Sequence, residues 1–124
     1  MTVATFNQPK DLGDLLLVQV SAGWSKDRVT LLGGSDYALG QVLAKVAHKY
    51  QALDPSGAGP AKKAVAVLAE RVDASAGDAP AVVIARGAVV ALAELVWPAG
   101  ITEPQQTAAL DELNALGIVA RVTL

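Results

Sequence analysis

The sequence predicts an α+β domain that is mainly β: a compact, small-barrel-like β domain with one C-terminal helix at about residues 103–116. Three observations support this fold class. Short β-prone runs recur between turn residues at a spacing of about 8–12 residues, which is typical of a compact β domain. A single helix signature stands near the C-terminal end. Hydrophobic residues make up 52% of the 124 residues and charged residues only 18%, so one real core is expected and wholesale disorder is excluded.

The N-terminal stretch differs from the rest of the chain. Residues 1–14 are polar, contain Pro9 and Gly13, and have no sustained period of 2 or 3.6. Chain termini of this kind are usually loose unless a partner holds them. We therefore expect two parts: a flexible N-terminal arm at residues 1–14 and a single folded domain at residues 15–124.

The expected strands follow the arm. The clearest signal is at residues 41–46, where alternate side chains separate into two sets, and the Gly- and Pro-rich residues 54–60 form an evident loop. Residues 64–70 combine helix-favouring Ala, Leu and Glu with strand-favouring Val, and their short length favours a strand. The expected strands lie within residues 15–20, 28–32, 41–46, 50–53, 64–72, 81–85, 88–92 and 118–124.

The helix has a complete set of boundary signals. Thr102 can be its N-cap, with Gln105 three residues later as in a capping box, and Pro104 falls in the first turn where a missing N–H costs little. Gly117 is a candidate to end it. We expect four residues to share the buried face, namely Ala109, Leu110, Leu113 and Leu116.

Catalytic chemistry has little support in the sequence. His48 is the only histidine and stands beside Lys49 in a context typical of a solvated turn, there is no cysteine, and no serine lies in a Gly-x-Ser-x-Gly elbow. The adjacent acids Asp111 and Glu112 fit the solvated face of the helix. Residues 57–63 lack the spacing of a phosphate-binding loop. We predict no catalytic residue, no cofactor and no metal site.

Charge and hydropathy limit the classes of binding partner that the sequence supports. The net charge is −2, and the longest basic block is the pair Lys62-Lys63, so nucleic-acid binding is not expected. The apolar runs are far shorter than the ~20 residues of a membrane helix, and the first residues do not resemble a secretory signal. We expect a soluble protein with neither a nucleic-acid nor a membrane partner.

Trp97 and Pro98 end the β region and lead the chain into the helix. Two interpretations remain open for this pair. Trp97 can plug the core beneath the helix, or it can be buried between subunits, where Trp is enriched.

The order of several segments resembles the head decoration protein family of tailed bacteriophages, whose type member is the lambda decoration protein D. The likeness spans roughly residues 28–121, and the order of its segments is more specific than any single motif. The residues that carry it are 28–31, 40–46, 49–50, 53–54, 64–74, 80–90, 95–102 and 113–121.

The resemblance implies the lambda head decoration protein D-like fold and a structural protein of the virion. Members form homotrimers on the exterior of the expanded capsid and cement the lattice of the phage major capsid protein, and they are made in the bacterial host cytoplasm. Their N-terminal arm orders on the capsid. In this chain β-prone residues suited to adding a strand to another protein's sheet precede Pro9, with Phe6 as the natural anchor; they are Val3, Ala4, Thr5 and Phe6.

Two alternatives remain at this point. One is another trimeric structural module of a phage tail or baseplate. The other is a small ligand-carrier domain, because Lys45 lies in a short strand between two turns, as the modified lysine of a carrier hairpin does.

Overall fold

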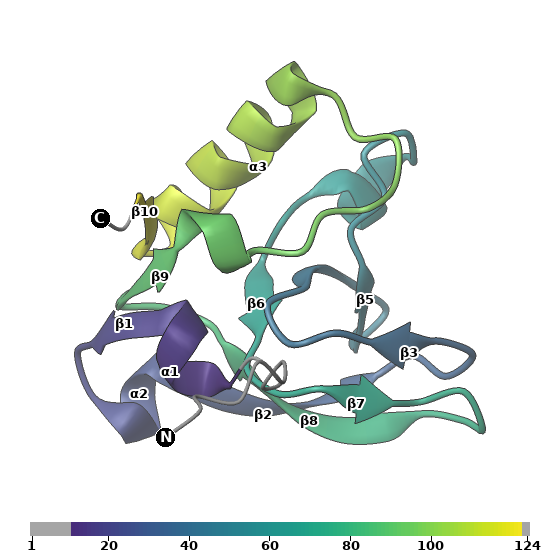
Figure 1. Cartoon of the computed structure of the whole chain (residues 1–124). Coiled ribbons are helices and arrows are strands. Elements are labelled where there is room, and N and C mark those ends of the chain that lie inside the picture. Colours follow the sequence, from purple (N-terminus) through teal and green to yellow (C-terminus); the bar gives the residue numbers. More distant parts are fainter. Residues whose placement is uncertain (1–10, 123–124) are drawn as a thin grey trace, which may run out of the picture.

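The computed structural model describes residues 11–122, and Figure 1 shows a barrel, a small sheet and one long helix. None of the helices in that range is long and apolar enough to cross a membrane. The strands are β1 Leu16–Gln19, β2 Lys26–Leu31, β3 Asp36–Tyr37, β4 Val42–Val46, β5 Lys49–Ala52, β6 Ala66–Leu68, β7 Val72–Asp73, β8 Ala79–Ile84, β9 Ala88–Ala91 and β10 Ile118–Arg121. The helices are α1 Leu12–Leu15, α2 Ala22–Ser25 and α3 Glu103–Ala115, with 3₁₀ turns at Gly59–Lys62 and Leu92–Glu94.

Five strands close into a barrel in the order β2-β5-β4-β6-β8. The longest ladder joins β2 to β8 in antiparallel register from Lys26↔Ile84 to Leu31↔Ala79, and it closes the ring. The parallel pairing of β2 with β5 has a single register pair, Leu31↔Tyr50. The predicted mainly β, barrel-like domain with one C-terminal helix is confirmed.

Two barrel strands, β4 over its first three residues and β6, are buried on both faces. In β4, Leu43 belongs to the cluster inside the barrel, whereas its neighbours Val42 and Ala44 belong to a second cluster outside it. In β6, Ala66 and Leu68 face the interior, and the residue between them, Val67, packs in the second cluster. Successive side chains of a strand point to opposite faces, so the part of a strand that lies between two cores needs apolar residues at successive positions.

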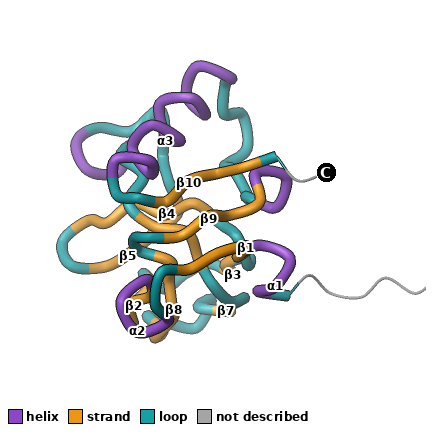
Figure 2. Tube along the Cα trace, turned by 90° about the vertical axis from the view of Figure 1, so that its left-hand side faces the viewer, coloured by secondary structure: helices purple, strands orange, loops and turns teal. Residues whose placement is uncertain are grey.

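The second cluster lies between the barrel, a three-stranded sheet and α3. The sheet has the order β1-β9-β10, with β9 antiparallel to β1 and parallel to β10, and Figure 2 shows these strands side by side. Val90 of β9, Leu113 of α3 and Ile118 of β10 are at most 1% exposed and meet in this cluster. Thus the helix and the small sheet cover one side of the barrel.

Helix α3 begins as predicted. The Thr102 hydroxyl accepts from the Gln105 backbone N–H at 3.3 Å, and the Gln105 side chain accepts from the Thr102 N–H at 2.9 Å, which completes the capping box. Ala109 and Leu113 are buried and Leu110 packs against the core. The prediction for Leu116 was wrong: it is 40% exposed, because the helix ends at Ala115 and the C-cap residue turns away from the buried face.

Two short helices were not predicted. In α1 the Asp11 and Asp14 side chains cap each other's backbone N–H groups, and Leu15 is fully buried. Leu12 packs against the second cluster. The last residues of the predicted arm therefore form part of the folded body, while residues 1–10 lie outside the described part of the chain.

The turn between β8 and β9 carries the chain from the barrel to the small sheet. Gly87 in this turn has φ 57°, and a Cβ built on it would stand 2.1 Å from Cζ3 of Trp24. The carbonyl of Gly87 accepts from the hydroxyl of Ser25 at 3.0 Å and from the N–H of Val20 at 2.9 Å. Ser25 is fully buried, and its carbonyl accepts from the N–H of Ala85 at 2.8 Å. Helix α2 is thereby fixed to this turn.

We predict that Gly87→Ala destabilises the protein by about 2–3 kcal/mol. A left-handed backbone costs a residue with a Cβ about 1–2 kcal/mol, and displacement of the Trp24 ring adds to it. Gly59→Ala is the matched control, because Gly59 has φ 62° and nothing within 4 Å of the built Cβ. Urea unfolding should show the larger loss at Gly87, and adding Trp24→Ala should remove the excess. Equal losses at the two glycines would contradict the contact.

In the hairpin turn between β4 and β5, two residues that carry a side chain adopt the left-handed conformation that glycine adopts most easily. Ala47 and His48 connect Val46 to Lys49 and have φ 51° and 71°, as the two central residues of a type I′ turn require. We predict that His48→Gly stabilises the protein by about 0.5–1 kcal/mol, because the relief of left-handed strain exceeds the entropy that glycine loses on folding. The urea midpoint should rise with an unchanged slope; a fall would contradict strain at this turn.

Candidate interaction surfaces

The polar residues considered for chemistry are dispersed. His48 is exposed at its turn, and Lys45 is exposed with its Nζ 5.7 Å from the ring centre of Tyr50. Asp111 is exposed on α3, whereas Glu112 accepts from the backbone N–H of Ala64 at 2.9 Å. Among residues 11–122 no group of three His, Cys, Asp or Glu side chains could hold a metal ion. The described geometry assembles no acid–base or nucleophile pair.

The sequence predicted two sets of site residues, a capsid-binding arm and the pair Trp97 and Pro98, and the structure describes only the second. Val3, Ala4, Thr5, Phe6 and Pro9 all lie outside the described residues, so their role as a capsid-binding arm stays a prediction. The described part of the chain begins at Asp11, the N-cap of α1.

Trp97 is partly buried and packs against the second core cluster. Its neighbour Val96 fixes the segment to the barrel: the Val96 N–H donates to the Gly40 carbonyl at 2.9 Å, and the Val96 carbonyl accepts from the Val42 N–H at 3.1 Å. Part of the Trp97 side chain is therefore a core contact. The exposed remainder leaves the interpretation as an interface residue a prediction.

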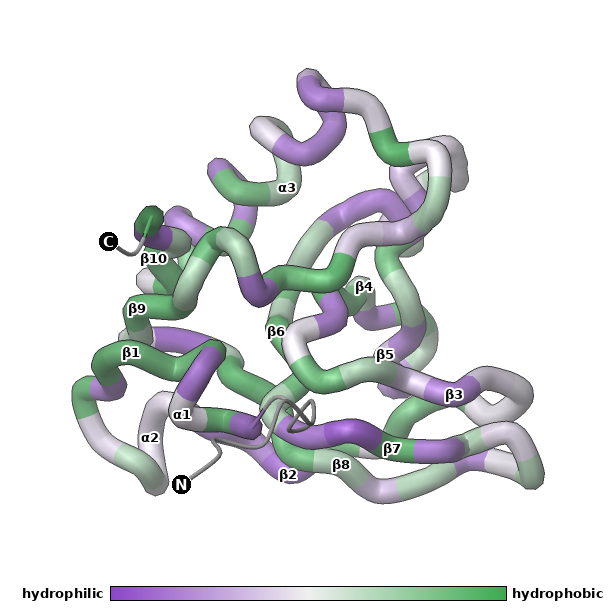
Figure 3. The backbone as a smooth tube through the Cα atoms, viewed as in Figure 1, coloured by the Kyte–Doolittle hydropathy of each residue, from purple (hydrophilic) through white to green (hydrophobic). Residues whose placement is uncertain are grey.

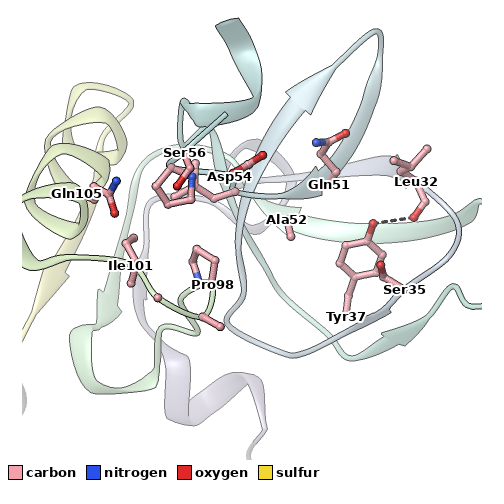
Figure 4. Close-up of a pocket in the computed structure, with 14 residues that line it drawn as sticks. Leu32, Ser35, Tyr37, Gln51, Ala52, Asp54, Ser56, Pro98, Ile101 and Gln105 are labelled. Carbon is pink, nitrogen blue, oxygen red and sulfur yellow. Dashed lines mark hydrogen bonds between the residues drawn. The ribbon is translucent and has the colours of Figure 1, made fainter. Parts of the chain in front are cut away.

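Pro98 lines an open cavity of about 360 Å³ between the barrel, the loop after β5 and the start of α3. Figure 4 shows the Tyr37 hydroxyl donating to the Leu32 carbonyl at one end, 2.6 Å away, and Gln105 at the other. Burial raises the pKa of Tyr37. Asp54 is the only ionisable carboxylate of the lining, so this cavity can receive a side chain or a turn but has no paired groups for catalysis.

A second cavity, of about 460 Å³, lies beside Trp24. Arg86 and Asp27 form a two-pronged ion pair in its lining, with Arg86 Nη1 3.0 Å from one carboxylate oxygen and Nη2 2.5 Å from the other. The hydrogen bonds from Arg86 lower the pKa of Asp27 and those to Asp27 raise the pKa of Arg86. Arg86 also donates to the Trp24 carbonyl and lies 5.8 Å from the Trp24 ring.

The sequence analysis did not identify Trp24 as a surface residue, although its side chain is 52% exposed. Val18 and Val20, at 53% and 72%, are exposed nearby on β1 and just after it. Figure 3 shows this side of the molecule as largely hydrophobic along β1 and β9. The sequence carries one signal that could have indicated this apolar surface: Val18, Val20 and Trp24 lie in a segment with few charges.

Comparisons with known proteins identify the family of this chain. A search of curated proteins found no match. The family model described as "Bacteriophage lambda head decoration protein D" matches residues 5–118 of the 124-residue chain. This family is structural and its place is the phage capsid. With a match of that extent, the chain belongs to the bacteriophage lambda head decoration protein D family.

Proposed function

We propose that this protein binds the exterior of an expanded phage capsid as a homotrimer and cements the lattice of the major capsid protein. The family match over residues 5–118 is the observation that carries this proposal. The exposed apolar side chains of the small sheet and α2 support it, because large exposed apolar patches mark protein–protein contacts. The protein is made in the bacterial host cytoplasm and acts on the outside of the particle.

The N-terminal arm supplies one contact in this proposal. Residues 1–10 precede the capped helix α1, whose Leu15 is fixed in the core, so the arm is tethered at a defined point. Val3, Ala4, Thr5 and Phe6 are β-prone and can add to an exposed strand edge of the capsid protein by main-chain hydrogen bonds. Phe6 supplies an apolar anchor, and Pro9 separates this segment from α1.

Trimer formation multiplies these contacts. Three linked arms convert the second and third binding events into intramolecular ones, so modest individual contacts give strong retention. Trp97 and Pro98 are candidates for the subunit contact, together with the exposed apolar side chains described above.

The first prediction of this proposal is a gain in capsid stability. A protein that binds only the expanded lattice stabilises it by an amount that grows with the logarithm of its concentration over its dissociation constant. Adding the protein to undecorated expanded capsids should raise their disruption temperature, and the rise should increase with protein concentration. Calorimetry of the particles measures it. An unchanged temperature at saturating occupancy would overturn the cement role and leave surface display.

A second prediction separates the arm from the folded body. Deletion of residues 1–10 should leave the thermal unfolding of the isolated protein nearly unchanged, because Asp11 and Leu15 are retained. Capsid binding should fall at least ~10-fold, because the deletion removes the contacts of the arm with the capsid. In the proposal these contacts outweigh the cost of ordering the arm, which is about 1–2 kcal/mol per residue.

Deletion of residues 1–14 is the matched comparison. It also removes the Asp11–Asp14 capping pair and the core contact of Leu12, so this variant should unfold at a lower temperature. Co-sedimentation with expanded capsids and one circular-dichroism melt test both variants. Undiminished binding after the shorter deletion would place the capsid contact on the folded body.

A further inference from the structure

Five exposed apolar side chains lie around the turn at Gly87, and we call this surface the Trp24 face. Gly87 is its centre: the Trp24 ring lies against it, the Val20 N–H donates to its carbonyl, and the following N–H, of Ala88, donates to Gly117, the residue after Leu116. The five members are Val18, Val20, Trp24, Leu116 and Val119, with exposed fractions of 53%, 72%, 52%, 40% and 37%.

Strand register extends this surface across the small sheet. Val18 of β1 and Val119 of β10 both pair with Val89 of β9, so the three valines form one row on one face of the sheet. Their neighbours Ala88, Val90 and Ile118 are buried on the opposite face. Figure 2 shows the same three strands next to α2, which carries Trp24. The outward face of the sheet has no covering element among the described residues.

Trp24 is held in position before any partner arrives. One edge of its ring lies on Gly87, Arg86 lies 5.8 Å from the ring, and Asp27 fixes Arg86 through two hydrogen bonds. Ser25 anchors the helix that carries it. Immobilising a flexible side chain on binding has an entropic cost, and little of that cost remains for Trp24. An exposed, pre-positioned Trp of this kind is typical of a binding hot spot.

Two cations beside the Trp24 face, Lys63 and Arg121, are not paired with a carboxylate among the described residues. Lys63 lines the same cavity as Trp24 and Leu116. Arg121 lies two residues after Val119 on β10, so it shares the outward face of the sheet. Neither cation makes an ion pair within residues 11–122, whereas Arg86 is already paired with Asp27. The complementary surface therefore needs small apolar side chains and unpaired carboxylates.

The outward side of α3 has those properties. Glu103, Thr107, Asp111 and Ala115 follow one another at intervals of four, so they form a single exposed line along the helix. Thr107 and Ala115 are small enough to let a partner approach closely. The two carboxylates make no ion pair among the described residues.

We propose that the Trp24 face of one copy packs against the outward side of α3 in the next copy. The contact joins two different surfaces of the same chain, and such a head-to-tail contact closes into a ring when three steps complete a turn. The two surfaces lie next to each other at Leu116, the C-cap residue that follows α3. This inference deepens the proposed homotrimer and rests on it.

The apolar part of the contact is tested with Val20→Glu. The side chain of Val20 is 72% exposed, so the folded subunit should tolerate the change, while a buried carboxylate in the interface should not be tolerated. The dissociation constant of self-association should rise at least ~30-fold, as at a hot spot. Thr30→Glu is the matched control, since Thr30 is exposed on β2 of the barrel and should leave association unchanged. Sedimentation equilibrium gives the mass, and circular dichroism checks the fold.

Charge reversal tests which two surfaces meet. Lys63→Glu with Arg121→Glu should weaken association through repulsion by the α3 carboxylates, and so should Glu103→Lys with Asp111→Lys. All four changes in one chain restore complementarity and should recover the wild-type mass. Failure of this recovery, with all three proteins folded, would overturn the assignment of α3 as the partner surface.

The remaining outcomes separate this inference from the proposed function. A wild-type protein that sediments with expanded capsids but gives no carbodiimide cross-link there between Lys63 of one copy and an α3 carboxylate of the next would overturn the contact and leave decoration intact. A wild-type trimer that does not bind capsids would leave the contact intact and overturn decoration. If Val20→Glu abolishes capsid binding without changing the mass of the trimer, the Trp24 face contacts the capsid and the inference is wrong.

Discussion

The turn at Arg86 and Gly87 is the constraint on which the arrangement of the molecule depends. It is the point where the chain leaves the barrel and enters the small sheet, and the buried Ser25 ties α2 to it from a distant part of the sequence. Because Gly87 has no side chain, the Trp24 ring can lie directly on the backbone there. One left-handed glycine thus connects the two cores and positions Trp24, the most exposed aromatic side chain among residues 11–122.

Two cores in a chain this small explain much of its composition. The strands between them, such as β4 and β6, need apolar residues on both faces, and α3 with the small sheet needs an apolar side toward the barrel. The 18% of charged residues is therefore partly a consequence of internal packing. The outward valines of the small sheet and Trp24 belong to neither core, and in the contact proposed above a second copy covers them.

The elements with strong local signals could be predicted from the sequence. The capping box at Thr102 and the alternation at residues 41–46 are read from neighbours in the chain, and both correspond to real elements. The four-residue helices α1 and α2 could not be found, because neither is long enough to show a helical period. The exposure of Trp24 was missed for another reason. It depends on a contact with Gly87, more than sixty residues away, and no local pattern reports such a contact.

Closure of the barrel has a consequence for a protein crowded onto a particle surface. In the ring β2-β5-β4-β6-β8 each strand has a neighbour on both sides, although β2 meets β5 through a single register pair, so the ring leaves no end strand. Among the described strands, only β1, β10 and the short pair β3-β7 leave an edge open. Open edges are the templates on which unrelated chains stack into aggregates. A subunit built this way can reach a high local concentration while offering few open edges for non-specific strand pairing.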